Sequence, residues 1–329
     1  MLHRIAFVRR AVPAIVMAIG AATLTATAYA QGAWPNRPIR FLVGYPPGGS
    51  IDLIARIVAS ELVPALGQPV VVENRPGASG NVAAAEVVRA APDGYTFLVS
   101  STTVETANPS LYKANFQPSS DLMPVNSIGR GAIYLVGRPG LEVNDVKGLI
   151  ALAKANPGKL SYGSPGTGTQ PHLAGELLKV NAGIQATHIP YKGSAPAIQD
   201  LMSNQIVFML DPGISLPYIQ AGKVKLLAVL SAKRSPYFPQ VQTTAEQGVQ
   251  GSEVDIWYGI WAPKGMPKAI MERLSNELRR AMELPTVQEK FNKVNAEPAV
   301  VGDTAFRKII SQESDVFSRL IRDLGITAN

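Results

Sequence analysis

The stretch that decides the fold is Ile39-Arg40-Phe41-Leu42-Val43-Gly44-Tyr45-Pro46-Pro47-Gly48-Gly49-Ser50-Ile51-Asp52. The apolar run at residues 39–45 predicts a short buried strand, and apolar side chains at helical spacing over residues 51–66 predict an amphipathic helix. Glycines between them let backbone amides approach a ligand, and the start of the helix offers unpaired donors in a favourable dipole. The pattern predicts either a backbone site for a carboxylate or phosphate, or an ordinary turn between strand and helix.

The candidate ligand-binding residues of this first loop are Tyr45, Pro46, Gly48, Gly49 and Ser50. Its prolines stiffen the approach to the helix. Asp52 would repel an anion, so we expect it to complement the first helical turn rather than to contact a ligand.

The hydrophobic pattern predicts two series of alternating strands and helices. The first series continues with a strand at residues 70–72, a helix at 81–90 and a strand at 95–100. The second series has strands at residues 133–137, 160–163, 187–190, 206–210 and 225–230, and helices at 145–155, 171–181, 195–203 and 216–221. Repeated strand-helix-strand units predict right-handed crossovers and a mostly parallel sheet.

The last part of the chain has a different pattern. A returning strand is predicted at residues 253–262, and helices are predicted at 267–282, 286–294 and 303–324, packed outside the first unit. A chain that leaves one unit, builds a second and returns crosses twice between them, as in a hinged molecule. We therefore expect an α/β protein of two lobes joined by a two-crossing hinge. Lobe 1 would hold residues 31–130 and 253–329, and lobe 2 residues 131–252.

A second loop rich in glycine and hydroxyl groups is Tyr162-Gly163-Ser164-Pro165-Gly166-Thr167-Gly168-Thr169-Gln170-Pro171-His172. It also lies after a predicted strand and before a predicted helix. Thr169 or Gln170 is near the cap, and Pro171 stands where its missing N–H costs little. Because open α/β sheets bind ligands at the carboxyl ends of their strands, the two loops can face each other across a cleft.

The first 30 residues differ from the rest of the chain. Arg4, Arg9 and Arg10 form a positive segment, residues 11–26 are almost wholly apolar, and Ala28-Tyr29-Ala30 is a cleavage pattern. The apolar run is shorter than the roughly 20 residues that a membrane span needs. A cleavable signal peptide is therefore predicted over residues 1–30, with export of the mature chain to the periplasm.

The composition argues against several classes of site. Without the leader the formal charge falls from +7 to +4, and the scattered Lys and Arg indicate no nucleic-acid footprint. The chain has no cysteine and, after the leader, only His172 and His188, which lack metal-ligand spacing. Neither glycine-rich loop matches a P-loop or a dinucleotide motif. We expect no metal, no cofactor and no catalysis.

Two rival functions stay open at this point. A secreted α/β hydrolase would pair Ser164 with His172 and Asp211, although the surrounding residues lack the G-x-S-x-G pattern and no oxyanion hole can be placed. The effector domain of a regulator would share a two-lobed fold. The leader and the absence of a helix-turn-helix segment argue against that second reading.

Several motifs follow one another in a fixed order along the mature chain. They are Ile39-Arg40-Phe41-Leu42-Val43-Gly44-Tyr45-Pro46-Pro47-Gly48-Gly49, Gly67-Gln68-Pro69-Val70-Val71-Val72-Glu73-Asn74-Arg75-Pro76-Gly77, Asn108-Pro109-Ser110-Leu111-Tyr112, His172-Leu173-Ala174-Gly175-Glu176-Leu177, Ile189-Pro190-Tyr191-Lys192-Gly193 and Ser231-Ala232-Lys233-Arg234-Ser235-Pro236. The ordered set resembles the Bug family, the extracytoplasmic receptors of tripartite tricarboxylate transporters. The resemblance covers essentially the whole mature chain and implies a type II periplasmic-binding-protein fold that closes on a ligand between its lobes.

The resemblance also implies roles for individual residues. A ligand carboxylate would meet residues 46–50 mainly through backbone groups and ordered water. The further implied site residues are Thr102 and Thr103 from lobe 1 and Ser164, Gly166, Thr167, Thr169, Tyr191 and Asp211 from lobe 2. The implied partners are a small organic acid and either permease subunits in a membrane or a sensor kinase. We expect a monomer that binds no nucleic acid.

Two positions depart from the family pattern. Glu105 stands where relatives often carry His or another neutral polar residue, and we include it among the site residues. Inside the cleft it would repel a second carboxylate and favour a neutral, hydroxylated or amino-bearing end of the ligand. The alternative for Glu105 is a solvent-exposed loop charge. Val207 stands where Asp is common and fits a buried strand.

Overall fold

The computed structural model describes residues 34–328, so the predicted signal peptide lies outside the described residues. From Arg37 onward the contacts of the chain join it into one compact unit that holds two β-sheets. Of the helices in the described range, none combines the length and the apolar character that a membrane crossing requires.

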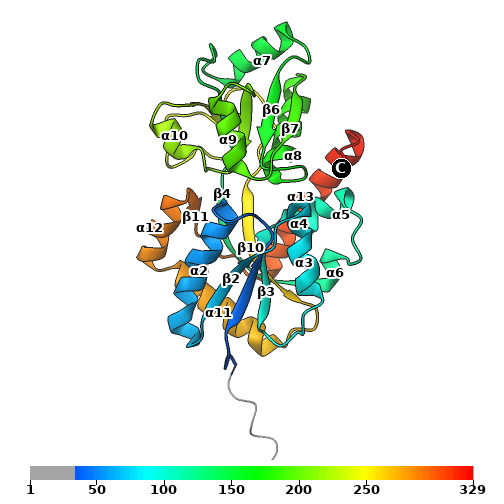
Figure 1. Cartoon of the computed structure of the whole chain (residues 1–329), viewed down its shortest axis with the longest axis vertical. Helices are drawn as coiled ribbons and strands as arrows, with labels where there is room; N and C mark the ends of the chain where they lie inside the picture. Colours follow the sequence, from blue (N-terminus) through cyan, green and yellow to red (C-terminus); the bar gives the residue numbers. More distant parts are fainter. Residues whose placement is uncertain (1–33, 329) are drawn as a thin grey trace, which may run out of the picture. The chain divides into compact units, whose positions relative to one another are not determined.

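The first sheet has six strands in the order β11-β4-β10-β3-β1-β2. The strands are β1 (Ile39–Val43), β2 (Val70–Asn74), β3 (Thr96–Ser101), β4 (Leu122–Gly131), β10 (Ile256–Pro263) and β11 (Ala296–Glu297). β1 pairs in parallel with β2 and β3, whereas β10 runs antiparallel between β3 and β4. The predicted returning strand therefore lies inside the first sheet rather than at its edge (Figure 1).

The second sheet has five strands in the order β7-β6-β8-β5-β9. The strands are β5 (Tyr134–Gly137), β6 (Ser161–Ser164), β7 (Thr187–Pro190), β8 (Phe208–Asp211) and β9 (Lys225–Val229). β6 pairs in parallel with β7 and β8, and β5 runs antiparallel to β8 and β9.

The prediction of a mostly parallel sheet is wrong. Of the nine strand pairings in the described residues, four are parallel and five are antiparallel. The reason is the path of the chain. β5 carries the chain into the second sheet, and β10 carries it back into the first. β5 is antiparallel to β8, and β10 is antiparallel to β3, although β8 and β3 belong to strand-helix-strand repeats. Both sheets are therefore mixed.

Helices flank both sheets (Figure 1). The helices are α2 (Ser50–Leu66), α3 (Asn81–Val88), α4 (Thr103–Thr106), α5 (Asn108–Leu111), α6 (Pro118–Asp121), α7 (Val146–Ala155), α8 (Gln170–Ala182), α9 (Ser194–Met202), α10 (Leu216–Gln220), α11 (Lys268–Met282), α12 (Pro285–Lys293) and α13 (Asp303–Asp323), with a 3₁₀ turn η2 (Ala78–Gly80). α11 and α12 pack on α2, and α13 packs on β4 and α4. The C-terminal helices thus cover the first sheet, as the sequence predicts.

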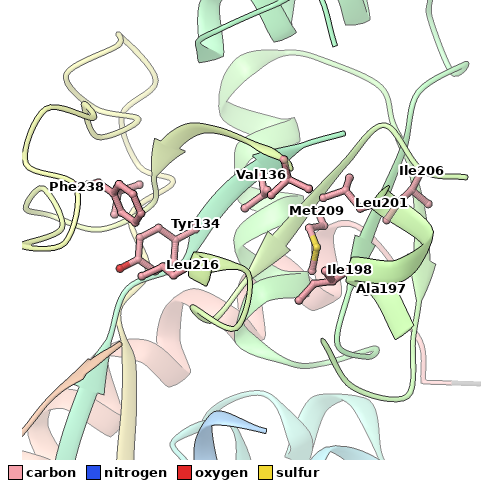
Figure 2. Close-up of a cluster of buried hydrophobic side chains, with 11 residues drawn as sticks. Tyr134, Val136, Ala197, Ile198, Leu201, Ile206, Met209, Leu216 and Phe238 are labelled. Atoms are coloured by element: carbon pink, nitrogen blue, oxygen red, sulfur yellow. The ribbon is translucent and has the colours of Figure 1, made fainter. Parts of the chain in front are cut away.

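Each sheet has its own apolar core. Around the first sheet, Leu42, Leu98 and Trp261 pack with Phe306 of α13. Beside the second sheet, Met209 lies near Ile198 and Leu201 of α9, and the same cluster extends to Tyr134, Leu216 and Phe238 (Figure 2). Burial of these side chains fixes the strands, and the fixed strands aim their terminal loops.

Candidate functional site

The first loop joins β1 to α2 and brings open amide donors to a cleft. Gly48 has φ +81°, a left-handed conformation that favours glycine, and Gly49 is the N-cap of α2 in an extended conformation. Within the described chain, the amides of Ser50 and Ile51 donate to no protein acceptor. An α-helix of 17 residues adds a partial positive charge at this end.

Asp52 accepts a hydrogen bond from one of the backbone amides that the sequence pattern offered to a ligand. The Gly48 amide donates to Asp52 Oδ2 at 2.9 Å, and Asn74 Nδ2 donates to Oδ1 at 2.9 Å. Arg56 lies 3.0 Å from Asp52 Oδ1 and balances its charge. Burial raises the pKa of Asp52, but the hydrogen bonds from Arg56, Gly48 and Asn74 outweigh it and leave the pKa below its ordinary value. The open donors are therefore the helical amides rather than the amide of Gly48.

The second loop joins β6 to α8 and is held from beneath by two histidines. Ser164 Oγ lies 2.7 Å from His188 Nε2, and the Gly168 amide donates to His172 Nδ1 at 3.1 Å. The two imidazole rings stack with centroids 3.9 Å apart. Burial lowers the pKa of His172 to about 4 and that of His188 to about 3, so both rings are neutral near pH 7. A neutral His172 can accept the amide hydrogen that positions the loop.

The hydrolase arrangement is not assembled. Ser164 is fully buried and pairs with His188, whereas the hydrolase hypothesis paired it with His172. Asp211 Oδ2 accepts from the Gly213 amide at 2.9 Å and from the Ser215 amide and hydroxyl at 2.7 Å each, and no hydrogen bond joins it to either of these histidines. Ser164 and His172 thus stabilise the second loop, whereas Asp211 stabilises the turn after β8.

A third loop joins β7 to α9, and of its residues the sequence analysis assigned only Tyr191 to the site. Gly193 has φ +108° and donates its amide to the Pro165 carbonyl at 3.0 Å, so this loop rests on the second one. Lys192, Gly193 and Ser194 line the same cleft as the first two loops. The signal was present in the sequence, because a glycine again follows a strand and precedes a helix.

These loops enclose a cleft with a volume of about 230 Å³. Six of the predicted site residues line it: Tyr45, Pro46, Gly48, Gly49, Ser50 and Thr169. Lining residues that the sequence analysis missed include Pro171, Lys192, Ser194, Pro196, Ile214 and Ile256. The helices α2, α8 and α9 all begin at this cleft, with Ser50, Gln170 and Ser194 as their first residues. Three helix N-termini therefore direct their dipoles towards one space.

The other predicted site residues do not line the cleft, and two of them, Thr102 and Thr167, connect loops of the two sheets. The lining does not include Thr102, Thr103, Glu105, Ser164, Gly166, Thr167, Tyr191 or Asp211. The Thr167 carbonyl accepts from Ser79 Oγ at 2.7 Å and from Tyr112 OH at 3.2 Å. Gln170 Nε2 donates to Thr102 Oγ1 at 2.9 Å. We call the contacts of Ser79 and Tyr112 with Thr167 the clasp.

Two of these residues, Thr103 and Gly166, contact side chains that line the cleft. Thr103 Oγ1 lies 3.3 Å from Tyr45 OH, and the Gly166 carbonyl accepts from Thr169 Oγ1 at 2.7 Å. Tyr191 OH donates to Asp200 Oδ2 at 2.7 Å, so its hydroxyl is engaged away from the lining. Burial and this hydrogen bond raise the pKa of Tyr191, which keeps the phenol neutral.

Glu105 occupies neither of the positions expected from the sequence. It is 8% exposed, and the Trp261 indole donates to Glu105 Oε1 at 2.5 Å. The reason is tertiary packing: α4, which carries Glu105, packs against α13, and Trp261 on β10 lies beside Phe306 of α13 with the ring centroids 5.5 Å apart. Burial raises the pKa of Glu105 to about 7. Glu105 is therefore an interior carboxyl group, neither a cleft residue nor a surface charge.

The family model for the tripartite tricarboxylate transporter family receptor matches residues 54–326. The protein BugT of Bordetella pertussis is 36% identical over 299 residues, covering 89% of this chain and 90% of its own. Among solved structures, the periplasmic binding protein BugD has a TM-score of 0.81 at 35% identity, covering 90% of this chain and 100% of its own. A protein from R. palustris solved with adipate has a TM-score of 0.85 at 32% identity, with the same coverage of 90% and 100%.

These matches confirm the predicted resemblance, the two-sheet periplasmic-binding-protein fold and a role in binding rather than catalysis. The hydrolase alternative finds no support in them. The family model and the BugT match together span most of the chain. The chain therefore belongs to the tripartite tricarboxylate transporter receptor family.

Proposed function

We propose that this receptor captures a small organic acid by its carboxylate at the cleft where α2, α8 and α9 begin. The single observation that supports this most strongly is the convergence of three helix N-termini on one space of about 230 Å³. Unpaired amides and helix dipoles both favour a negative group, and neither needs a basic side chain. The related proteins solved with adipate and with malate support the same chemistry.

Within this proposal the amides of Ser50 and Ile51 meet the carboxylate from one side, and those of Ser194 and Ala195 meet it from the other. The residues behind the lining, including Thr103, Ser164 and Asp211, hold the loops in place. Fixed donors lose little conformational entropy when the ligand arrives, and a bridging water can complete the contacts.

Closure of two lobes is the second part of the proposal. Lobe 1 comprises residues 31–130 and 253–329, and lobe 2 comprises residues 131–252. Two observations support this division: β4 ends at Gly131 shortly before β5 begins at Tyr134, and β10 returns to the first sheet at Ile256. Two short crossings suit a hinge, because only a few backbone angles need to change on closure.

We further propose that the mature receptor is a monomer in the periplasm, exported by a signal peptide at residues 1–30. It would deliver its ligand to permease subunits in the membrane or present it to a sensor kinase. The family's role as a solute receptor of transporters supports a membrane partner in general.

Calorimetry on the chain from Gln31 onward tests this function. The panel holds monocarboxylates, dicarboxylates and tricarboxylates, with sugars and divalent metal ions as other classes. We expect at least one carboxylate to bind with a Kd in the micromolar range or below, and a ligand-dependent decrease in radius of gyration. Binding of a sugar or a metal ion, with no carboxylate bound, would refute carboxylate capture.

A further inference from the structure

Away from the helix amides, the cleft is lined mainly by apolar side chains. Six prolines line it: Pro46, Pro47, Pro165, Pro171, Pro196 and Pro212. Three isoleucines, Ile51, Ile214 and Ile256, lie among them. Of the described residues that form this lining, Lys192 alone carries a charge, and its side chain is exposed. A ligand in this cleft would therefore contact hydrocarbon over much of its surface.

The three helix N-termini are not equivalent, because proline interrupts two of them. Pro171 is the second residue of α8, and Pro196 is the third residue of α9. A proline has no N–H, so each of these helices has one amide fewer for an anion and presents a ring to the cleft instead. The only proline in α2 is Pro64, far from the first turn. The amide donors are therefore most complete at α2 and sparser at α8 and α9.

Polar side chains of the lining are largely engaged within the protein. Tyr45 OH lies 3.2 Å from the Ser79 carbonyl oxygen, and Ser101 Oγ lies 2.7 Å from Thr103 Oγ1. Thr169 Oγ1 and Gln170 Nε2 donate to the partners described above. A second carboxylate would meet few free donors besides the exposed ammonium of Lys192, and its lost hydration would not be replaced among prolines and isoleucines.

We propose that the ligand is a monocarboxylate with an apolar body rather than a dicarboxylate or tricarboxylate. This inference rests on the proposed function and specifies the chemical class of its ligand. The carboxylate lies at the N-terminus of α2, and the hydrocarbon part lies against Pro196, Ile214 and Ile256. Burial of that part contributes favourable free energy in proportion to its apolar area.

Matched pairs of acids separate this inference from the proposed function. Calorimetry on the chain from Gln31 onward compares hexanoate with adipate and benzoate with terephthalate, so that each pair shares one carbon skeleton. We expect the monocarboxylate to bind at least tenfold more tightly in the better-binding pair. Equal or tighter binding of the dicarboxylate would overturn the inference and leave carboxylate capture intact. If no acid in the wider carboxylate panel bound, the proposed function itself would be overturned.

A pair of isoleucine variants tests where the hydrocarbon lies. Ile214 and Ile219 are both partly buried against the same core cluster, but only Ile214 is among the lining residues. Ile214→Ala should raise the Kd of the preferred monocarboxylate by about fivefold to tenfold, because about three methyl or methylene groups leave the contact. Ile219→Ala should leave that Kd unchanged. Equal effects of the two variants would contradict the placement, and urea unfolding of both would show that each is folded.

Discussion

At the N-terminus of α2, Gly49 has φ −75° and ψ 163°, and a Cβ there would meet only the Pro46 carbonyl oxygen, at 3.5 Å. Any residue can adopt this backbone conformation. Gly49→Val would nevertheless place methyl groups beside the amides of Ser50 and Ile51. We expect calorimetry to show at least a tenfold loss of carboxylate affinity. The free energy of unfolding, measured in urea, should change by less than about 1 kcal/mol.

A second N-cap glycine supplies the control for Gly49. Gly302 precedes α13 with φ −61° and ψ 167°, and a Cβ there would meet nothing within 4 Å. Gly302→Val makes the same chemical change at a matched cap outside the cleft lining, so it should leave affinity unaltered. Wild-type affinity in Gly49→Val would argue against capture by the α2 amides.

The buried carboxyl of Glu105 predicts a pH dependence of stability. Its pKa is about 7 in the folded protein against an ordinary 4.5, so between these values the folded chain keeps a proton that the unfolded chain releases. Stability therefore falls as pH rises through this window. Glu105→Gln cannot ionise and still offers an oxygen to the Trp261 indole. The variant should gain about 3 kcal/mol over wild type at pH 8 relative to pH 4.5.

Urea unfolding of both proteins at pH 4.5, 6, 7 and 8 measures this difference. The comparison with wild type matters because His172 and His188 act in the opposite sense: with lowered pKa values they cost stability as pH falls below about 6.5. These histidines are shared by both proteins and cancel in the difference. A difference that stayed constant with pH would show that Glu105 does not titrate as its burial implies.

At the scale of one element, the turn after β8 depends on a single side chain. Asp211 Oδ2 accepts three hydrogen bonds from Gly213 and Ser215, and the turn carries Pro212 and Ile214 into the cleft. Asp211→Ala would leave two buried amides and a hydroxyl without this acceptor. We expect a loss of roughly 2–4 kcal/mol in the free energy of unfolding together with weaker ligand binding.

Asp145 provides the comparison for Asp211. It caps α7 by accepting from the Gly148 amide at 2.7 Å, and it does not line the cleft. Asp145→Ala should cost about 1 kcal/mol of stability and leave affinity unchanged. If Asp211→Ala lost stability but bound ligand as tightly as wild type, the turn would not be a determinant of the site.

Most strands and helices could be predicted from hydrophobic spacing, but β4 could not. Its residues Pro124, Asn126 and Ser127 interrupt the apolar pattern, yet all three are buried, and polar partners from later in the chain reach Asn126 and Ser127. Asn126 Nδ2 donates to Ser275 Oγ at 2.8 Å, and Ser127 Oγ donates to the Ala299 carbonyl at 2.6 Å. A strand whose polar groups are satisfied by distant residues has no local signature.

The candidate site was predictable to a similar degree. A glycine between a strand and a helix predicted the first two loops, and residues of both loops line the cleft. Whether a residue lines the cleft or lies behind it depends on tertiary contacts, such as the pairing of Ser164 with His188. For the same reason Ile214 and Ile256 look like ordinary core residues in the sequence.

For the molecule as a whole, the clasp connects loops of the two sheets. Thr167 of the second loop accepts from Ser79 beside α3 and from Tyr112 after α5. If these contacts stabilise the ligand-bound state, the double variant Ser79→Ala with Tyr112→Phe should weaken binding by about tenfold. Calorimetry gives the affinity, and small-angle scattering should show a larger radius of gyration at the same ligand saturation.

Ser110→Ala serves as the control for the clasp, because Ser110 is an exposed residue of α5 two positions before Tyr112 in the chain. It should match wild type in both measurements. An unchanged Kd in the double variant would mean that the clasp contributes equally to the free and bound receptors.

The amides at the N-termini of α2, α8 and α9 belong to the main chain. A substitution there removes an amide hydrogen only if the new residue is proline. The prolines and isoleucines beside them contribute through their side chains. Substitutions at these positions can therefore change which acid the receptor prefers, while the main-chain amides continue to bind the carboxylate. In a library of variants selected for binding a new ligand, substitutions should accumulate at Pro196, Ile214 and Ile256 and should be rare in the glycine loop before α2.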